Sequence, residues 1–225
     1  MKIITLLAGK PDVFPATGTG EWWDKEWTSA LDKQPVSSGM WLGYEGLVGD
    51  GVADTKVHGG VDRAICVYPV EHYPHWRSTL SLFGLPHGAL GENFTTQGLL
   101  ETEVCIGDIY RVGTARVQVS QPRQPRQPCW KPARRWKVKA FTLLIEQTGY
   151  TGFYFRVLQH GEVRAGDVFT LEKRLHSAFT IAHCNEVYYR RKINAEAAFS
   201  LAACPELSGG WKDMLHTRAR ALTAV

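Results

Sequence analysis

The stretch KVHGGVDRAICVYP, Lys56 to Pro69, leads from a glycine turn into an apolar run. Residues 64–68 are apolar or aromatic and follow a turn signal, which predicts a short buried strand. The paired glycines let the backbone approach a ligand closely, and Lys56 and Arg63 flank them with positive charge. The segment is therefore either an anion-binding turn or an ordinary glycine turn with surface charges.

Short strands separated by glycine-containing turns are predicted through the first three quarters of the chain. They lie within residues 2–9, 64–68, 89–99, 103–113, 115–122 and 170–172. Val117 and Val119 alternate with polar neighbours, which is typical of a half-buried strand. Two helices are expected in this part, one over residues 70–84 that Pro74 interrupts early and one over residues 140–148.

The character of the chain changes near Ala178, where helix formers replace strand alternation. Asn194 is placed to cap a helix that stops at Pro205, and a further helix follows. We therefore expect an α+β fold, with a β-rich domain over residues 1–175 and a small helical domain over residues 176–225.

Composition limits the possible partners and compartments. The net charge of +4 and the pI of about 8.8 suit an anionic ligand but fall short of a polymeric nucleic-acid binder. The apolar run at the N-terminus is too short for a signal peptide or a membrane span, so a cytoplasmic protein is expected. The chain has five cysteines and no Cys-x-x-Cys spacing, which argues against a disulfide framework and a closed zinc site.

The stretch SQPRQPRQPCWKPARRW, Ser120 to Trp136, places Cys129 among four arginines, one lysine and four prolines. The prolines disfavour a regular helix or a central strand, and the cations favour the thiolate. This setting indicates a reactive or metal-binding sulfur, although a lone cysteine is more commonly a small buried side chain. The other cysteines are expected to be buried in apolar surroundings: Cys66, Cys105, Cys184 and Cys204.

Several polar residues admit both a functional and a structural interpretation. Glu92 and Asn93 follow a glycine-rich turn and can bind either a polar heterocycle or the loop backbone. The segment EGLVGD, Glu45 to Asp50, is typical of a turn rather than a site. His72 and His75 are three residues apart but lack a third ligand in a recognisable zinc pattern.

Four motifs of this chain closely resemble those of the MOSC domain proteins. In chain order they are KVHGGVDRAICVYPVEHYPHW, GALGENFTT, IGDIYRVG and VSQPR…QPCWK. These proteins are relatives of the C-terminal domain of molybdenum-cofactor sulfurase. The resemblance covers roughly residues 2–174 and is closest to the bacterial YiiM-like branch. The helical end resembles the three-helix domain that is appended in that branch.

The resemblance implies a β-barrel-like fold that binds the molybdenum cofactor, a pterin dithiolene with a phosphate; pyridoxal phosphate is not expected. It implies that Cys129 ligates molybdenum. The residues implied to line or shape the cofactor site are Lys56, His58, Gly59, Arg63, Glu92, Asn93, Gln121 and Arg126. His58 is either a proton donor, because imidazole titrates near neutral pH, or a structural turn residue.

The implied activity is reduction of small N-hydroxylated compounds, such as hydroxylamino base analogues, to amines. The sequence has no flavin, haem or iron–sulfur motif, so a separate reductase, expected to be a flavoprotein, would supply electrons. The alternative is a cofactor carrier or sulfur-transfer module that uses a persulfide on Cys129. A nucleic-acid-binding role for residues 123–135 is disfavoured by the modest net charge.

This chain has one Gln-Pro-Arg unit more than the family pattern. We expect the extra triplet to bulge around Gln124 and Pro125, because loops tolerate insertions at little cost. In this interpretation Arg126 lies beside the cofactor and Arg123 points to solvent. Deleting residues 123–125 should then preserve cofactor binding.

Overall fold

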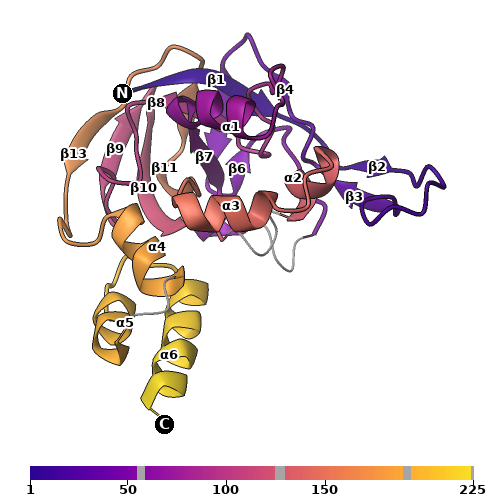
Figure 1. The fold of residues 1–225 in the computed structure, drawn as a ribbon. Coiled ribbons are helices and arrows are strands. Elements are labelled where there is room, and N and C mark those ends of the chain that lie inside the picture. Colours follow the sequence, from indigo (N-terminus) through magenta and orange to yellow (C-terminus); the bar gives the residue numbers. More distant parts are fainter. Residues whose placement is uncertain (55–58, 125–129, 190–193, 224–225) are drawn as a thin grey trace.

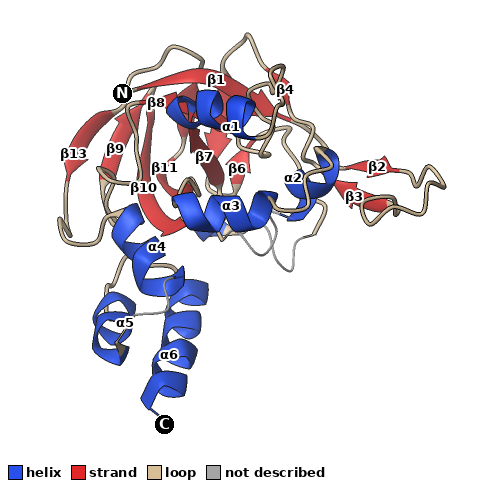
Figure 2. Ribbon diagram, viewed as in Figure 1, coloured by secondary structure: helices blue, strands red, loops and turns tan. Residues whose placement is uncertain are grey.

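A curled, mixed sheet of eight strands forms the centre of the molecule (Figures 1 and 2). The computed structural model describes residues 1–54, 59–124, 130–189 and 194–223. All pairings in this sheet are antiparallel except that between β7 and β8. The strand order is β13 (Thr170–Lys173), β9 (Ile109–Val112), β10 (Ala115–Pro122), β11 (Phe153–Gln159), β7 (Ile65–Pro69), β8 (Phe94–Gln97), β1 (Lys2–Ala8) and β4 (Gln34–Pro35).

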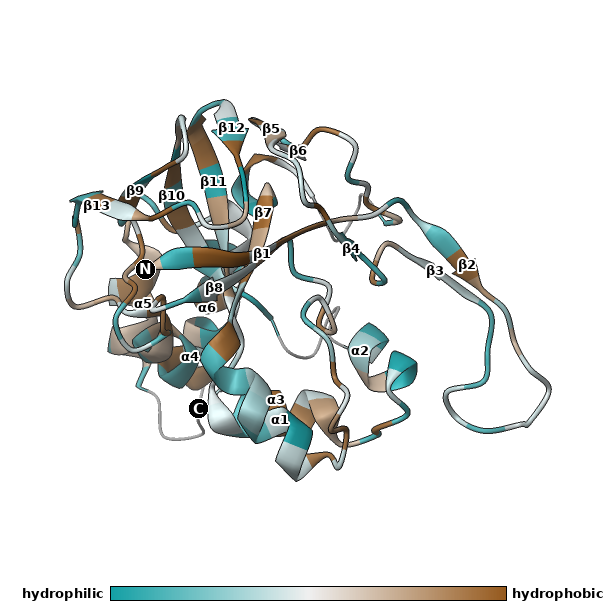
Figure 3. Ribbon diagram, turned by 90° about the horizontal axis from the view of Figure 1, so that it is seen from above, coloured by the Kyte–Doolittle hydropathy of each residue, from teal (hydrophilic) through white to brown (hydrophobic). Residues whose placement is uncertain are grey.

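Two smaller sheets extend this framework. One has the order β12 (Gly161–Val163), β5 (Met40–Gly43) and β6 (Gly46–Leu47). The other is the hairpin of β2 (Asp12–Phe14) and β3 (Trp27–Ser29), which projects away from the main sheet (Figures 1 and 3). The segment between residues 10 and 41, for which the sequence predicts no strand, therefore contains short strands.

Short helices cover part of the sheet and enclose a second apolar cluster. They are the 3-10 turns η1 (Val61–Arg63) and η2 (Val70–His72), and the helices α1 (Tyr73–Thr79), α2 (Trp130–Arg135) and α3 (Phe141–Thr148). Trp76 from α1 and Phe141 from α3 are fully buried in this cluster, with ring centroids 5.2 Å apart. Burial of these aromatic side chains against each other stabilises the packing of the two helices.

Two proline-based expectations are wrong in detail. Pro74 does not interrupt α1 but lies in its first turn, and Pro132 lies in the first turn of α2. The first backbone N–H groups of a helix have no partner within the helix, so proline is tolerated there. Residues 103–108 form a turn rather than part of a strand, with Asp108 accepting a hydrogen bond from the Cys105 N–H at 3.0 Å.

Three helices follow the sheet: α4 (Ile181–Tyr189), α5 (Ala195–Ala202) and α6 (Gly209–Thr223). The predicted cap is confirmed, because Asn194 Oδ1 accepts a hydrogen bond from the Ala197 N–H at 2.8 Å. One apolar cluster runs from strand residues such as Val119 to helix residues such as Trp211 and Leu215.

The α+β fold class with C-terminal helices is confirmed. The domain boundary at residue 175 stays a prediction, since the shared apolar cluster crosses it. No helix in the described ranges is both long and apolar enough to span a bilayer.

Candidate functional site

A cavity of about 760 Å³ opens beside the main sheet. Its walls come from the segment after β3, the β5–β6 hairpin and the residues that follow it, and the junction of η1 and β7. The loop before β8 and the start of α2 complete them. Five glycines contribute to the lining: Gly43, Gly46, Gly51, Gly59 and Gly91. A site of this size, built from several chain segments, accommodates a small organic ligand or cofactor.

Four cationic side chains of the described residues converge on the cavity: Lys33, Arg63, Arg123 and Lys131. They come from segments far apart in the chain, and only Arg63 was expected from the sequence. Lys131 Nζ donates to the Thr28 carbonyl at 3.3 Å, and burial lowers the pKa of this ammonium group. An anionic group in the cavity would offset the cost of burying these charges.

Asp50 links the Lys33 side of the cavity to the loop before β8. Its Oδ1 lies 2.5 Å from Lys33 Nζ and accepts from the Gly9 N–H at 2.8 Å. Its Oδ2 accepts from Asn93 Nδ2 at 2.8 Å. The sequence assigned Asp50 to a turn and gave no role to Lys33, because the partners lie 17 and 43 residues from Asp50.

Asn93 and Glu92 have different positions, although they are neighbours in the chain. Asn93 lines the cavity, and its Oδ1 accepts from the Cys66 N–H at 3.1 Å. Glu92 is fully buried and is not among the lining residues. Its carboxylate accepts from Tyr73 Oη at 2.5 Å, Thr95 Oγ1 at 2.8 Å and the Gly88 N–H at 2.8 Å. Glu92 therefore accepts hydrogen bonds from its own loop, as the structural interpretation of this residue predicted, and its role in shaping the cofactor site stays a prediction.

Two further expected residues lie at the site in different ways. Gly59 lines the cavity with a φ of 76°, a conformation that favours glycine. Gln121 is buried away from the lining, and its Oε1 accepts from Arg63 Nε at 3.4 Å. Gln121 therefore orients Arg63 rather than lining the cavity itself.

Arg123 is the clearest correction at the site. It was expected to point to solvent, but it is only 5% exposed and lines the cavity, where Nη2 donates to the Leu90 carbonyl. Its backbone N–H is fixed by the Gly152 carbonyl at 3.0 Å, directly after β10 ends. Strand pairing therefore determines where this arginine lies. The other expected residues lie outside the described ranges: Lys56, His58, Arg126 and Cys129.

The four other cysteines are buried, as expected, but Cys66 has an additional feature. It lines the cavity together with Tyr154. These residues are direct partners in the antiparallel pairing of β7 and β11, so their side chains lie on the same face of the sheet. Sequence patterns did not predict that Cys66 and Tyr154 line a cavity, because a continuous apolar strand does not reveal which of its faces borders a cavity.

The curled sheet and the cation-rich, glycine-lined cavity define a protein that can bind an anionic organic ligand of cofactor size. A family model described as MOSC domain matches residues 54–170, and a model described as YiiM-like, 3-alpha helix domain matches residues 179–219. The chain belongs to the MOSC domain family, in its YiiM-like branch.

Three relatives illustrate this membership. Uncharacterized protein YflK from Bacillus subtilis (strain 168) is 42% identical over 93% of this chain and 90% of its own length. The crystal structure of YiiM from Geobacillus stearothermophilus has a TM-score of 0.77 and 38% identity, and covers 97% of this chain and 98% of its own. A protein named Reductase from Gibberella moniliformis (strain M3125 / FGSC 7600) is 33% identical over 81% of this chain but only 32% of its own length.

Proposed function

We propose that this protein is a molybdenum-cofactor-dependent reductase that converts small N-hydroxylated compounds to amines. One observation carries the proposal: Arg63, Arg123 and Lys131 converge on a cavity of cofactor size in a MOSC domain. MOSC domains are generally associated with the molybdenum cofactor. The relative named Reductase supports redox chemistry within this group of proteins.

The residues present fit an anionic pterin cofactor. The cavity volume of about 760 Å³ lies within the usual range for cofactor sites. Arg63 and Arg123 would hold the phosphate, and the backbone at Gly59 and Gly91 permits close approach. At Gly91 a Cβ atom would lie 2.8 Å from Leu31 Cδ1, so a larger residue would push into the lining.

The proposed role of Cys129 as molybdenum ligand rests on its sequence motif, since this residue lies outside the described ranges. The first described cation on each side of it in the chain, Arg123 before it and Lys131 after it, lines the cavity. This arrangement supports a thiolate near the same cavity, because nearby cations stabilise the ionised sulfur.

When bound, the cofactor would supply oxygen-atom transfer from the N–OH group. Overall, the substrate takes up two electrons and two protons, and the products are an amine and water. Lys131 lines the cavity with a lowered pKa, so its ammonium group can donate a proton more readily than an exposed lysine. His58, which lies outside the described residues, remains the second proposed donor.

The proposed electron donor is a separate flavoprotein. The fungal relative named Reductase matches this chain over only 32% of its own length, so most of that protein has no counterpart here. This difference in length is consistent with an arrangement in which the additional part of the longer protein transfers electrons, while a separate protein does so here.

The test is to produce the full chain in a host that makes the molybdenum cofactor. Bound molybdenum and pterin are measured, and turnover of a hydroxylamino purine is followed with a chemical reductant. Turnover should disappear in Cys129→Ser and persist in Cys105→Ala, which removes a buried thiol that does not line the cavity. Full activity of Cys129→Ser would refute the proposal. Bound cofactor without turnover in the parent chain would instead favour the carrier function.

A further inference from the structure

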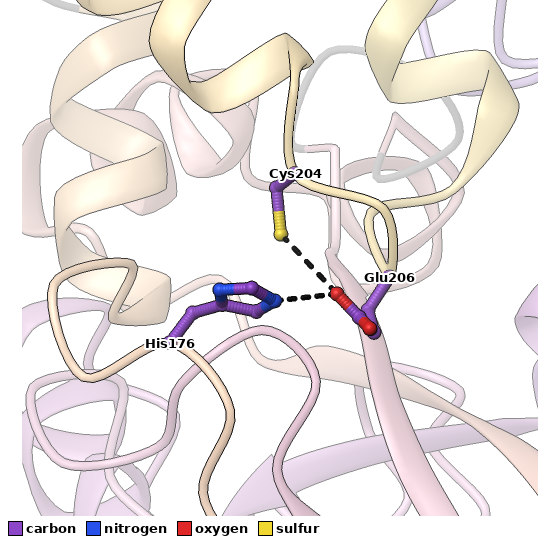
Figure 4. A group of neighbouring side chains, drawn as sticks. All are labelled: His176, Cys204 and Glu206. Carbon is purple, nitrogen blue, oxygen red and sulfur yellow. Dashed lines mark hydrogen bonds and ion pairs between the residues drawn. The ribbon is translucent and has the colours of Figure 1, made fainter.

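A second group of reactive side chains lies where the sheet meets the helices (Figure 4). His176 comes from the loop after β13, whereas Cys204 and Glu206 come from the loop between α5 and α6. Nε2 of His176 lies 2.5 Å from Oε2 of Glu206, and Sγ of Cys204 lies 3.9 Å from the same oxygen. All three atoms that can bind a metal lie within 4.8 Å of one another.

The surroundings hold this group together. Gly107 lies against it with a φ of 82°, and a Cβ atom there would be 3.2 Å from both His176 Cδ2 and Glu206 Cγ. A side chain at this position would therefore displace both residues. Backbone pairing fixes the same region, since the Ile106 N–H donates to the Phe179 carbonyl at 2.9 Å.

The burial of the group is graded. Cys204 is 2% exposed, while the side chains of His176 and Glu206 are 26% and 22% exposed. The thiol therefore lies at the inner end of the group, and water can reach the outer end. This arrangement offers three protein ligands to a metal ion and leaves the fourth position of a tetrahedral ion accessible to solvent.

We propose that His176, Cys204 and Glu206 form a zinc site with one water ligand, joining the helices to the sheet. A thiolate, an imidazole and a carboxylate are the ligands that Zn²⁺ accepts in proteins, whereas Mg²⁺ and Ca²⁺ prefer oxygen alone. The site is separate from the cavity, since none of its residues is among the cavity lining.

Zinc binding requires only small movements of these side chains. Tetrahedral bonds of about 2.0 to 2.3 Å place ligand atoms roughly 3.4 to 3.6 Å apart. The 2.5 Å contact between His176 and Glu206 would lengthen, and the 3.9 Å contact between Cys204 and Glu206 would shorten. The thiol proton would pass to solvent, and the imidazole would carry its remaining proton on Nδ1.

The experiment uses the full chain after dialysis against a chelator. Zn²⁺ binding is measured by calorimetry, and Co²⁺ is added as a spectroscopic substitute. We expect one tightly bound ion per chain, intense tetrahedral Co²⁺ bands and a sulfur-to-cobalt charge-transfer band. With zinc at about a hundredfold above its Kd, the Tm should rise by roughly 5 to 10 °C.

Variants distinguish a metal site from a simple ion pair. Cys204→Ala should abolish the charge-transfer band, and His176→Gln should weaken zinc binding at least tenfold. His183→Gln should change neither, because His183 is an exposed histidine outside this group. His176→Gln changes a partly exposed side chain, so it tests the proposal even if Cys204→Ala folds poorly.

Two results would overturn the proposal. One is the absence of stoichiometric zinc binding by the parent chain. The other is equal zinc affinity in the parent chain and in His176→Gln, with only a lower Tm in the variant. The second result would identify the contact between His176 and Glu206 as a structural ion pair.

Discussion

Arg123 and Arg126 belong to identical Gln-Pro-Arg units, and Arg123 directly follows the paired strand β10, whereas Arg126 lies outside the described residues. Because Arg123 is buried in the cavity lining, Arg123→Ala should weaken cofactor binding roughly ten- to hundredfold, the usual effect of losing a hydrogen bond from a charged group. Pterin and molybdenum content per purified chain measures this loss. A larger loss in Arg126→Ala than in Arg123→Ala would contradict the assignment.

A deletion cannot separate the two arginines. Removing residues 123–125 or residues 126–128 leaves the same sequence, SQPRQPC. In either case an arginine directly follows Pro122, the last residue of β10. We therefore expect the shortened chain to bind the cofactor, and the point variants carry the distinction.

Lys131 gives a prediction about stability and pH. Burial lowers its pKa in the folded protein, so the unfolded chain holds this proton more tightly. Burial of the charged ammonium group destabilises the folded protein fully at any pH below the pKa that Lys131 has in the folded state. This destabilisation disappears as the pH rises from that pKa to the ordinary pKa of lysine. Lys131→Met should raise the free energy of unfolding of the apoprotein at neutral pH while weakening cofactor binding. Its stability advantage should shrink in alkaline buffer, as measured by urea unfolding across the pH range.

At the scale of elements, the turn between α1 and β8 depends on one buried carboxylate. Glu92 accepts hydrogen bonds from Tyr73, Thr95 and the backbone of Gly88. Glu92→Gln would remove charge-assisted bonds and should lower the free energy of unfolding by roughly 1.5 to 3 kcal/mol. Tyr73→Phe, which removes one donor, should cost about 1 kcal/mol. Equal stability of Glu92→Gln and the parent chain in denaturant titration would refute this account.

Sequence patterns located those elements that have a clear local signal. The alternation at Val117 and Val119 marked β10, and Asn194 marked the start of α5. The helical role of Pro132 was missed, because proline acts as a helix breaker or as a first-turn residue depending on its position. The strand pairs near the N-terminus were also missed, since segments of two or three residues carry too little periodicity.

The candidate site was predictable only where a motif was continuous. Gly59, Arg63 and Asn93 line the cavity, and they belong to the continuous motifs through which the resemblance to the MOSC family implied them. Lys33 and Lys131 were not, because tertiary folding alone brings these residues to the cavity. The same reason applies to His176, Cys204 and Glu206, whose chain spacing matches no zinc motif.

At the scale of the molecule, the C-terminal helices support the cavity. Nε1 of Trp211 in α6 donates to the carbonyl of Pro122 at 3.1 Å, one residue before Arg123. The Ser208 N–H donates to the Ser120 carbonyl at 3.0 Å. These bonds tie the end of β10, and with it the start of the arginine segment, to the helical part of the chain.

Trp211→Phe tests this support, because it removes the indole N–H and keeps an aromatic ring at the same buried position. The lost hydrogen bond should cost about 1 kcal/mol of stability, and the cavity left by the smaller ring adds to this cost. Because the end of β10 loses its anchor, cofactor content should fall more than in Trp41→Phe, a change at a half-exposed tryptophan of β5 in a smaller sheet. Cofactor content is compared at a temperature well below both melting points. Similar content in the two variants would contradict this role of Trp211.

The apolar cluster shared by strands and helices also affects synthesis. The Ile181 N–H donates to the Val104 carbonyl at 2.9 Å, and residues from Ile106 to Leu215 belong to one cluster. A ribosome delivers Ile106 long before the helices that cover it. Until α6 has emerged, the nascent sheet would present an uncovered apolar surface to the cell, which is the kind of surface that chaperones bind and that promotes aggregation.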